Sequence, residues 1–350
     1  MTSPAIDPAS LERNPLPAND VGACAVAYPN MALVKYWGKR DETLTLPVTG
    51  SLSMTLDIFP TTTAVRLTDD AATDTVTLNR YPADEACVGR ITGFLDTIRA
   101  LAGRRERAVV DTVNTVPTGA GLASSASGFA ALAAASAAAY GLRPDARALS
   151  RLARRGSGSA CRSIFGGFVI WHAGTGFGQA GDESCYAEPL AAALDPALVI
   201  AVVDAGPKQI PSRTAMRQSV ATSPLYPEWA AATRTDLEQM RSAIATGDLV
   251  RAGRIAEHNA LGMHATLLAA CPSIRYLSPR SLLVLDRVEQ LRATGVAAYA
   301  TIDAGPNVAV LCARADAARV VVALRELGGF VSTRVAHCGP GVTVVGGDRR

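Results

Sequence analysis

The sequence lacks the features that identify several large classes of protein. Its 350 residues carry a formal net charge of only +3, and no Lys/Arg tract extends beyond GRRER at 103–107, so a nucleic-acid or membrane-surface protein is not indicated. No secretory leader and no internal repeat of roughly 20–50 residues is found. The most apolar stretch, GFAALAAASAAAYGL, is Ala-rich and shorter than the ~20 residues of a membrane-spanning helix. We expect a buried helix there, and any anionic ligand must be held by local groups.

The cysteines and histidines do not form a pattern that binds metal. The seven cysteines are odd in number and scattered without a CxxC pair, so neither a disulfide framework nor a zinc site is indicated, and the reducing cytoplasm is the expected location. His258 and His264 are six residues apart on a helical pattern and do not share a face, while His172 and His337 are isolated. Cys161 has no histidine that the sequence places beside it, which argues against a thiol nucleophile.

Apolar residues make up 49% of the chain, which is enough for an enzyme of two domains. Residues 1–20 resemble a flexible N-terminal leader, and residues 21–193 form the predicted N-terminal domain, with successive strands and a helix over 124–140. Residues 194–350 form the predicted C-terminal domain. Helical patterns at 227–246, 248–269 and 279–293 precede strand patterns there, which predicts an α+β layer sandwich.

The segment NTVPTGAGLASSASG, residues 114–128, has no charged side chain and almost no bulky one, and it leads into the Ala-rich helix. Unpaired main-chain N–H groups at such a helix start can hold phosphate oxygens, since no side chains block their approach. The spacing is not that of a Walker loop. A tight turn packed under the helix is the alternative.

A second possible anion site lies in RRGSGSACRS, residues 154–163. A helix is predicted to end at Gly156 and another to begin near Ser159, so that Ser157, Gly158 and Ser159 present their N–H groups. Arg162 would lie in the first turn of the new helix, where a cation opposes the helix dipole unless an anion offsets it. An ordinary helix cap with an exposed arginine is the alternative.

Three further segments carry charged groups at the ends of predicted elements. YWGKRD places Lys39 beside a glycine at a strand end, and TIDAGPN places Asp303 directly after an apolar strand. PKQIPSRTAM supplies Lys208, Ser212 and Arg213 around a helix start. A solvated lysine and an ordinary turn aspartate are the alternative interpretations.

These segments together resemble one family. PTGAGLASS resembles the nucleotide-phosphate loop of the GHMP kinase superfamily, and YWGK, GSGSACRS, SRTAM…TSP and YATIDAGPN, in that order, resemble diphosphomevalonate decarboxylases. The similarity runs from about residue 23 to about 310. It implies a two-domain α/β (α+β) GHMP kinase fold, with an N-terminal βαβ-type domain, a C-terminal ferredoxin-like sandwich and a cleft between them.

The resemblance also implies which residues act. It assigns ATP to Pro117, Gly121, Leu122, Ala123, Ser124 and Ser125. It assigns the substrate to Tyr36, Trp37, Gly38, Lys39, Ser157, Gly158, Ser159, Ala160, Cys161, Arg162, Ser212 and Arg213. It assigns catalysis to Asp303, Lys39 and Arg162. The sequence departs from the family pattern at Ala215, which replaces a commoner glycine, and at Tyr28-Pro29, which differs from the usual residues before Asn30. Arg213 stands where eukaryotic relatives tend to have a threonine and resembles the bacterial version.

The implied reaction transfers the γ-phosphate of ATP to the 3-hydroxyl of mevalonate 5-diphosphate, then releases phosphate and CO₂ to give isopentenyl diphosphate. Asp303 would act on the hydroxyl, with Lys39 tuning its charge by proximity, Arg162 orienting the substrate carboxylate and Mg²⁺ held mainly by ATP. A homodimer without nucleic-acid or membrane partners is expected. The alternatives are a decarboxylase of mevalonate 5-phosphate, a kinase that stops at the phosphorylated alcohol, and a silent ligand-binding relative.

Overall fold

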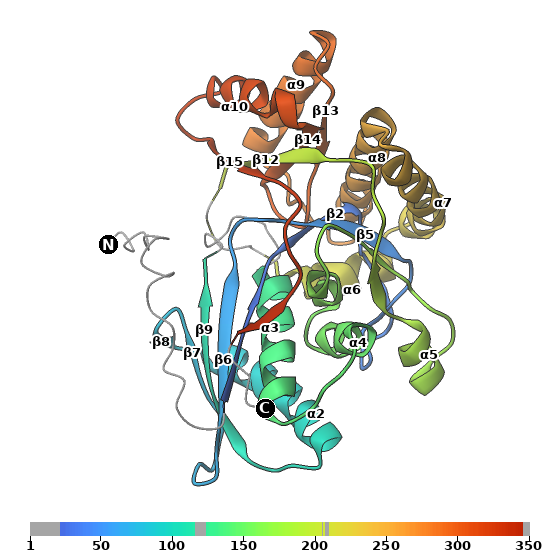
Figure 1. Ribbon diagram of the computed structural model, residues 1–350. Helices are drawn as coiled ribbons and strands as arrows, with labels where there is room; N and C mark the ends of the chain where they lie inside the picture. The colour runs from blue at the N-terminus through green and yellow to red at the C-terminus, as the bar shows by residue number, and fades with distance from the viewer. Residues whose placement is uncertain (1–21, 116–123, 205, 207–209, 346–350) are drawn as a thin grey trace.

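The computed structural model describes residues 22–115, 124–204, 206 and 210–345. Its largest sheet has six strands in the order β16-β1-β6-β9-β7-β8, all antiparallel to their neighbours except the parallel pair β7 and β9 (Figure 1). These strands are β1 (Gly22–Ala27), β6 (Thr61–Thr68), β7 (Thr75–Leu78), β8 (Tyr81–Pro82), β9 (Arg107–Asn114) and β16 (Thr343–Val345).

A helical crossover connects the two parallel strands, as a parallel pair requires. Helix α2 (Glu85–Ala102) lies between β8 and β9 in the chain, begins where the Asp84 side chain accepts a hydrogen bond from the Cys87 N–H, and ends at Gly103 in the left-handed region. The N-terminal domain therefore has the expected βαβ-type crossover.

The Ala-rich helix lies in the middle of the N-terminal core. Helix α3 (Ser124–Ala139) is buried on nearly every side, packed against the sheet and against α4 (Ala146–Gly156). Its alanines allow this close approach because they leave the backbones little side chain to separate them. At Gly156 an added Cβ would lie 2.0 Å from Cδ1 of Phe129, so only glycine fits at this end of α4. The predicted buried helix over 124–140 is confirmed.

A second, antiparallel sheet has the order β11-β10-β5-β2 and carries several polar residues of the site. Its strands are β2 (Asn30–Val34), β5 (Ser51–Thr55), β10 (Phe168–Trp171) and β11 (Ala187–Pro189). Beside it lie the hairpin β3 (Lys39–Asp41) with β4 (Leu46–Pro47), the 3₁₀ helix η1 (Gly158–Ile164) and helix α5 (Gly178–Ser184), which interrupts the connection from β10 to β11.

The C-terminal half forms the layered sandwich that the sequence predicts. Its antiparallel sheet has the order β13-β14-β12-β15, with β12 (Pro196–Val202), β13 (Ala298–Thr301), β14 (Val308–Ala313) and β15 (Ser332–Ala336). Its helices are α6 (Ser212–Thr222), α7 (Tyr226–Thr246), α8 (Leu249–Leu268), α9 (Pro279–Ala293) and α10 (Ala317–Arg325), with a 3₁₀ turn η2 (Arg314–Asp316).

Strand β12 shows how this sheet separates two cores, because its side chains alternate between the two faces. Val199 packs with α9 and α10, whereas Leu198 and Ile200 pack with α7 and α8 and with residues of β2 and β5. The core around Leu198 and Ile200 thus joins the two halves of the chain.

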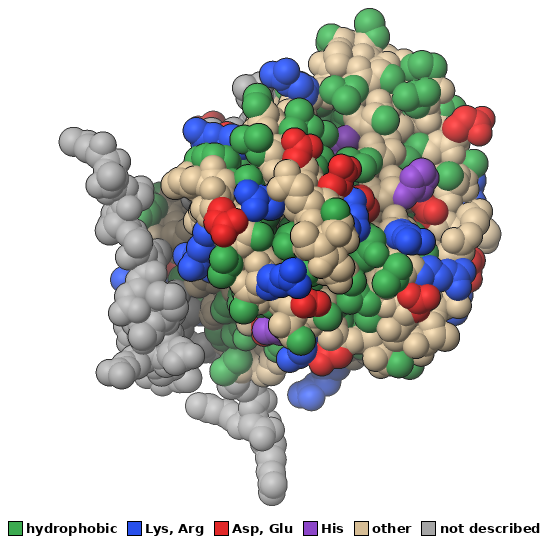
Figure 2. All heavy atoms as spheres, turned by 90° about the horizontal axis from the view of Figure 1, so that it is seen from above, with side chains coloured by type: hydrophobic (Ala, Val, Ile, Leu, Met, Phe, Trp, Pro, Cys, Tyr) green, Lys and Arg blue, Asp and Glu red, His purple; other side chains and the backbone are tan. Residues whose placement is uncertain are grey.

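The end of the chain returns to the N-terminal sheet. Strand β16 pairs with β1, and Leu56 forms an isolated bridge with Cys338. In the face shown in Figure 2, positive and negative side chains are interspersed. Among the described residues, no helix combines the length and the apolar character needed to cross a bilayer.

Candidate active site

An ion pair joins the two halves of the chain at the end of β2. Lys35 follows β2 directly, and its Nζ donates to Oδ1 of Asp303 at 2.7 Å and to the carbonyl of Ala32 at 2.9 Å. The Lys35 side chain is 2% exposed and that of Asp303 is 21% exposed. The carboxylate therefore reaches accessible space while a buried ammonium supports it. Burial lowers the pKa of Lys35, and the contact with Asp303 opposes that effect.

Arg162 is buried in the same region but is held by neutral groups. Its guanidinium donates to Oγ of Ser53 at 2.9 Å, to Oγ of Ser51 at 2.6 Å and to Oδ1 of Asn30 at 3.1 and 3.2 Å. In the part of the chain that the structure describes, it forms no ion pair with an acid. These oxygens satisfy its hydrogen bonds but leave its charge uncompensated.

The charges of Lys35, Arg162 and Asp303 influence one another. Burial lowers the pKa of Arg162, whereas the negative charge of Asp303 raises it, and the charge of Arg162 in turn lowers the pKa of Lys35. Lys35 pairs directly with the one carboxylate, whereas Arg162 is influenced by its charge without forming an ion pair with it. The excess positive charge would be offset by an anionic ligand, since charges interact strongly where water is excluded.

The Ser157–Ser159 segment lies next to the start of α3. Ser157 ends α4 and precedes η1, and its Oγ lies 3.2 Å from Oγ of Ser125. Gly158 lies under the ring of Tyr36, and an added Cβ would come within 2.6 Å of Tyr36 Cε1. The Tyr36 hydroxyl is buried and has no hydrogen-bond partner among the described residues. The two predicted anion sites are therefore adjacent, and beside them lies the Tyr36 hydroxyl, which has no hydrogen-bond partner among the described residues.

The structure corrects the predicted position of Arg162 in its helix. The helix is a 3₁₀ helix that begins at Gly158, and Arg162 lies in its last turn, where a cation is favourable to the helix dipole. The predicted dipole penalty therefore does not arise. The need for an anion comes instead from burial of the guanidinium among neutral oxygens. Ala160 and Cys161 are buried in η1, and burial raises the pKa of the Cys161 thiol.

The YWGK segment is fixed by contacts with α6 and α7. Trp37 is buried and its Nε1 donates to Oγ of Ser219 at 2.8 Å. Gly38 has a φ of 100°, and an added Cβ would lie 1.9 Å from Oη of Tyr226, so the position requires glycine.

Lys39 was expected to tune the charge of Asp303 by proximity, but it forms no ion pair with Asp303 among the described residues. The lysine that contacts Asp303 is Lys35, while Nζ of Lys39 lies 2.7 Å from Oε2 of Glu42. Local sequence favoured Lys39 because it follows a glycine and two aromatics. Lys35 interrupts the apolar run MALVKYW, and this buried charge was the signal that could have found it.

Helix α6 brings a third group of polar residues to the same place. Ser212 and Arg213 are its first residues, and Nη2 of Arg213 donates to the carbonyl of Gly156 at 2.9 Å. This contact sets the start of α6 beside the end of α4. Ser212 forms a hydrogen bond with Tyr276. Lys208 lies outside the described residues.

Part of the predicted ATP loop also lies outside the described residues, namely Pro117, Gly121, Leu122 and Ala123. Ser124 and Ser125 are described and begin α3. The first turn of α3 contains no acidic residue, so no negative charge there would repel a bound anion. No group of three or more His, Cys, Asp or Glu side chains placed to hold a metal is found within the described ranges.

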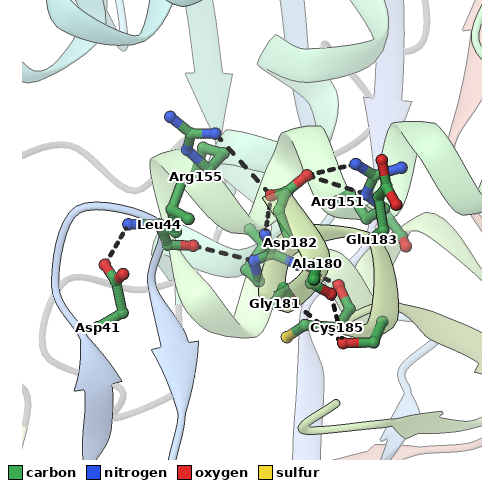
Figure 3. A network of polar contacts seen from close by, with 12 residues as sticks. Asp41, Leu44, Arg151, Arg155, Ala180, Gly181, Asp182, Glu183 and Cys185 are labelled. Atoms are coloured by element: carbon green, nitrogen blue, oxygen red, sulfur yellow. Dashed lines mark hydrogen bonds and ion pairs between the residues drawn. The ribbon is translucent and has the colours of Figure 1, made fainter. Parts of the chain in front are cut away.

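Figure 3 shows a network of polar contacts in which arginine side chains gather around Asp182. Arg151, Arg154 and Arg155 of α4 converge on the carboxylate of Asp182 in α5. Arg154 is fully buried and also donates to the carbonyl of Leu44, which lies in the β3–β4 hairpin, at 3.1 Å. The network ties the hairpin that carries Lys39 to the helix that precedes Ser157.

Sequence reasoning also missed His264. It lies on α8, is 2% exposed, and its Nε2 has no hydrogen-bond partner in the described part of the chain. Its pKa is lowered to about 4, chiefly by burial and then by the charge of Lys35, while main-chain hydrogen bonds to Ile302 and Asp303 oppose the shift. A neutral imidazole therefore lies behind the Asp303 turn.

Two family models cover most of the chain. Residues 27–187 match the diphosphomevalonate decarboxylase-like N-terminal domain, and residues 198–337 match the mevalonate 5-diphosphate decarboxylase C-terminal domain. The chain belongs to the diphosphomevalonate decarboxylase family.

Individual relatives agree with this assignment. The diphosphomevalonate decarboxylase of Candida albicans is 35% identical over 328 residues, which cover 90% of this chain and 91% of the relative. That of Rattus norvegicus is 37% identical over 337 residues, covering 88% and 80%.

Solved structures share the fold. The mevalonate diphosphate decarboxylase of Enterococcus faecalis is 41% identical, with a TM-score of 0.87 over 93% of this chain and 98% of that one. The enzyme of Staphylococcus aureus is 37% identical, with a TM-score of 0.88 over the same shares of the two chains. A structure described as MDDEF in complex with MVAPP, AMPPCP and magnesium is 42% identical, with a TM-score of 0.87 over 93% and 98%.

Proposed function

We propose that this chain is an ATP-dependent decarboxylase that converts mevalonate 5-diphosphate to isopentenyl diphosphate, ADP, phosphate and CO₂. The observation that carries the proposal is the position of Asp303, partly exposed and paired with Lys35, within the electrostatic influence of the buried, acid-free Arg162. One carboxylate that can receive a proton is thus electrostatically coupled to a cation that can hold the substrate's own carboxylate.

The first step is transfer of the γ-phosphoryl group of ATP to the 3-hydroxyl. The hydroxyl proton passes to the Asp303 carboxylate as the oxygen forms a bond to the γ-phosphorus and the bond from that phosphorus to ADP breaks. Lys35 fixes the carboxylate from beneath and stabilises its charge before the proton arrives. Alignment and charge neutralisation are the main requirements of such a transfer.

The phosphates are proposed to lie at three neighbouring helix starts. Ser124, Ser125 and the preceding loop hold ATP, whereas Ser157–Arg162, Tyr36 to Lys39, Ser212 and Arg213 hold the substrate. The contacts Ser125–Ser157 and Arg213–Gly156 support this, because they bring the starts of α3, η1 and α6 together. Mg²⁺ bound by ATP would neutralise charge on the transferred group, and it commonly takes its ligands from substrate phosphates with only one or two carboxylates.

The second step removes phosphate and CO₂. Once phosphorylated, the tertiary oxygen leaves as phosphate, and the electrons of the adjacent bond to the carboxylate form the new double bond as CO₂ departs. Arg162 orients the carboxylate. A cation that bound it more tightly in the ground state than in the transition state would slow its loss, so orientation is the more useful role.

The alternatives predict different products. A kinase of the same fold would release ADP without CO₂, and a decarboxylase of mevalonate 5-phosphate would need fewer diphosphate contacts. The arginine at position 213, placed at the start of α6 beside Gly156, favours the diphosphate because it adds a donor to that site.

We also propose a cytoplasmic homodimer. All seven cysteines are free, which suits a reducing compartment. Sedimentation at micromolar concentration tests the dimer, and a monomer throughout would contradict it.

The Asp303→Asn variant tests the central residue, since it keeps the shape but cannot accept the proton. We expect product formation to fall at least about a hundredfold, because general base catalysis contributes roughly 10²–10⁴. Nucleotide binding, measured by titration, should stay within about threefold. Asp286→Asn, on the exposed surface of α9, is the matched control. Turnover within a few-fold of wild type would show that Asp303 is not the base.

A further inference from the structure

Glu42 lies between two cations from different parts of the chain. Its Oε2 lies 2.7 Å from Nζ of Lys39, in the same hairpin. From α6, Arg217 reaches Oε1 with Nε and Oε2 with Nη2, each at 3.1 Å. Among the described residues, no other acid is within ion-pair distance of Lys39 or Arg217.

The three side chains lie at the edge of the candidate substrate site. The Lys39 side chain is 8% exposed, whereas those of Glu42 and Arg217 are 44% and 65% exposed. Burial chiefly raises the pKa of the Tyr36 hydroxyl, and the charges of Cys161 and Glu42 add to that effect, while the hydroxyl itself has no hydrogen-bond partner among the described residues. Lys39 thus points inward while Glu42 holds it from the rim.

A phosphate group bound at this site would compete with Glu42 for Lys39. Both are anions that need the same ammonium, and Glu42 is exposed enough for solvent to weaken its pair with Lys39, so the pair can be exchanged. The bidentate contact with Arg217 is independent of Lys39, so Glu42 keeps a partner when the lysine turns away. The hydrogen bond with Arg217 has the largest effect on the pKa of Glu42, and the hydrogen bond with Lys39 adds to it. Together they lower this pKa to about 2, so the competing carboxylate is charged at neutral pH.

We propose that Glu42 is a positioning residue for Lys39: it holds the lysine in the free enzyme and yields it to the diphosphate of the substrate, with Arg217 setting the ease of the exchange. The diphosphate as the displacing group rests on the proposed function. The exchange itself depends only on an anion that can replace the carboxylate.

The two partners of Glu42 give opposite predictions. Glu42→Gln removes the competing charge, so the KM for mevalonate 5-diphosphate and the Kd for inorganic pyrophosphate should both fall by about two- to fivefold, the range of an exposed ion pair. Arg217→Gln leaves Glu42 with Lys39 alone, so both constants should rise by a similar factor. The KM for ATP should stay unchanged in both variants.

A role in folding alone would not produce opposite signs. Glu326→Gln, which breaks the exposed pair with Arg287 at the C-terminal end of α10, controls for loss of one surface carboxylate. Thermal unfolding of each variant checks stability separately.

Shifts of pyrophosphate Kd in the same direction, no shift relative to Glu326→Gln, or no pyrophosphate binding to any form would each overturn the proposal. Opposite shifts in a protein that releases no CO₂ would support the exchange and reject the proposed function. Normal CO₂ release without those shifts would support the proposed function and reject the exchange.

Discussion

His264 predicts how the stability of the protein depends on pH. Its pKa is lowered to about 4 in the folded chain, against an ordinary value of 6.5, chiefly because the ring is buried and next because Lys35 is near. Below pH 6.5 the unfolded chain therefore takes up a proton at His264 that the folded chain refuses. The free energy of unfolding falls as the pH drops through this window, and the loss is complete near pH 4.

The size of the effect follows from the shift. One pKa unit corresponds to about 1.4 kcal/mol, so lowering the pH from 7.5 to 5 should cost about 2 kcal/mol through His264, and the full shift corresponds to about 3 kcal/mol. Protonation would also place a second positive charge near Lys35. The site should therefore lose order at mildly acid pH together with the fold.

Urea unfolding of wild type and His264→Asn at the two pH values measures this effect. The variant should be less stable at pH 7.5, but its loss between pH 7.5 and 5 should be about 2 kcal/mol smaller than that of wild type, because it cannot bind the proton. His258→Asn removes an exposed histidine from the same helix and should keep the wild-type loss. Equal losses in wild type and His264→Asn would refute the reasoning.

Two further substitutions test the site and its frame. Arg162→Gln should lower kcat by at least about tenfold, equivalent to ~1.4 kcal/mol, while the Kd for ATP changes less than about threefold; equal losses in both would argue against an orienting role. Gly38→Ala should lower the free energy of unfolding by about 1–3 kcal/mol, since alanine is strained at a φ of 100° and its Cβ overlaps Oη of Tyr226. Adding Tyr226→Phe should recover only part of that loss in denaturant unfolding, and full recovery would show that the backbone is not strained.

Local patterns predicted the elements that depend on neighbouring residues. Helix α3 was expected over 124–140 and spans Ser124–Ala139, and the 279–293 pattern matches α9. Short-range signals suffice here because helix caps and apolar periodicity are set within a few residues. The return of β16 to pair with β1 could not be predicted, since the two strands are separated by most of the chain.

The same distinction applies to the site. Asp303 and Arg162 could be proposed from their local motifs, but the partner of each is a long-range contact. Lys35 meets Asp303 across 268 positions of sequence, and Arg162 meets Ser51 across 111. The period-2 serines of SLSMT were a usable signal for buried polar groups on one strand face, whereas nothing near His264 indicates that α8 packs behind β13.

The most direct test of the account follows ADP and CO₂ separately while purified protein is supplied with ATP, Mg²⁺ and mevalonate carrying no, one or two 5-phosphates. We expect the diphosphate to be used most efficiently and to release one CO₂ for each ADP. ADP without CO₂ would show a kinase, and a preference for the monophosphate would show the related decarboxylase; either result would contradict the function proposed for this chain.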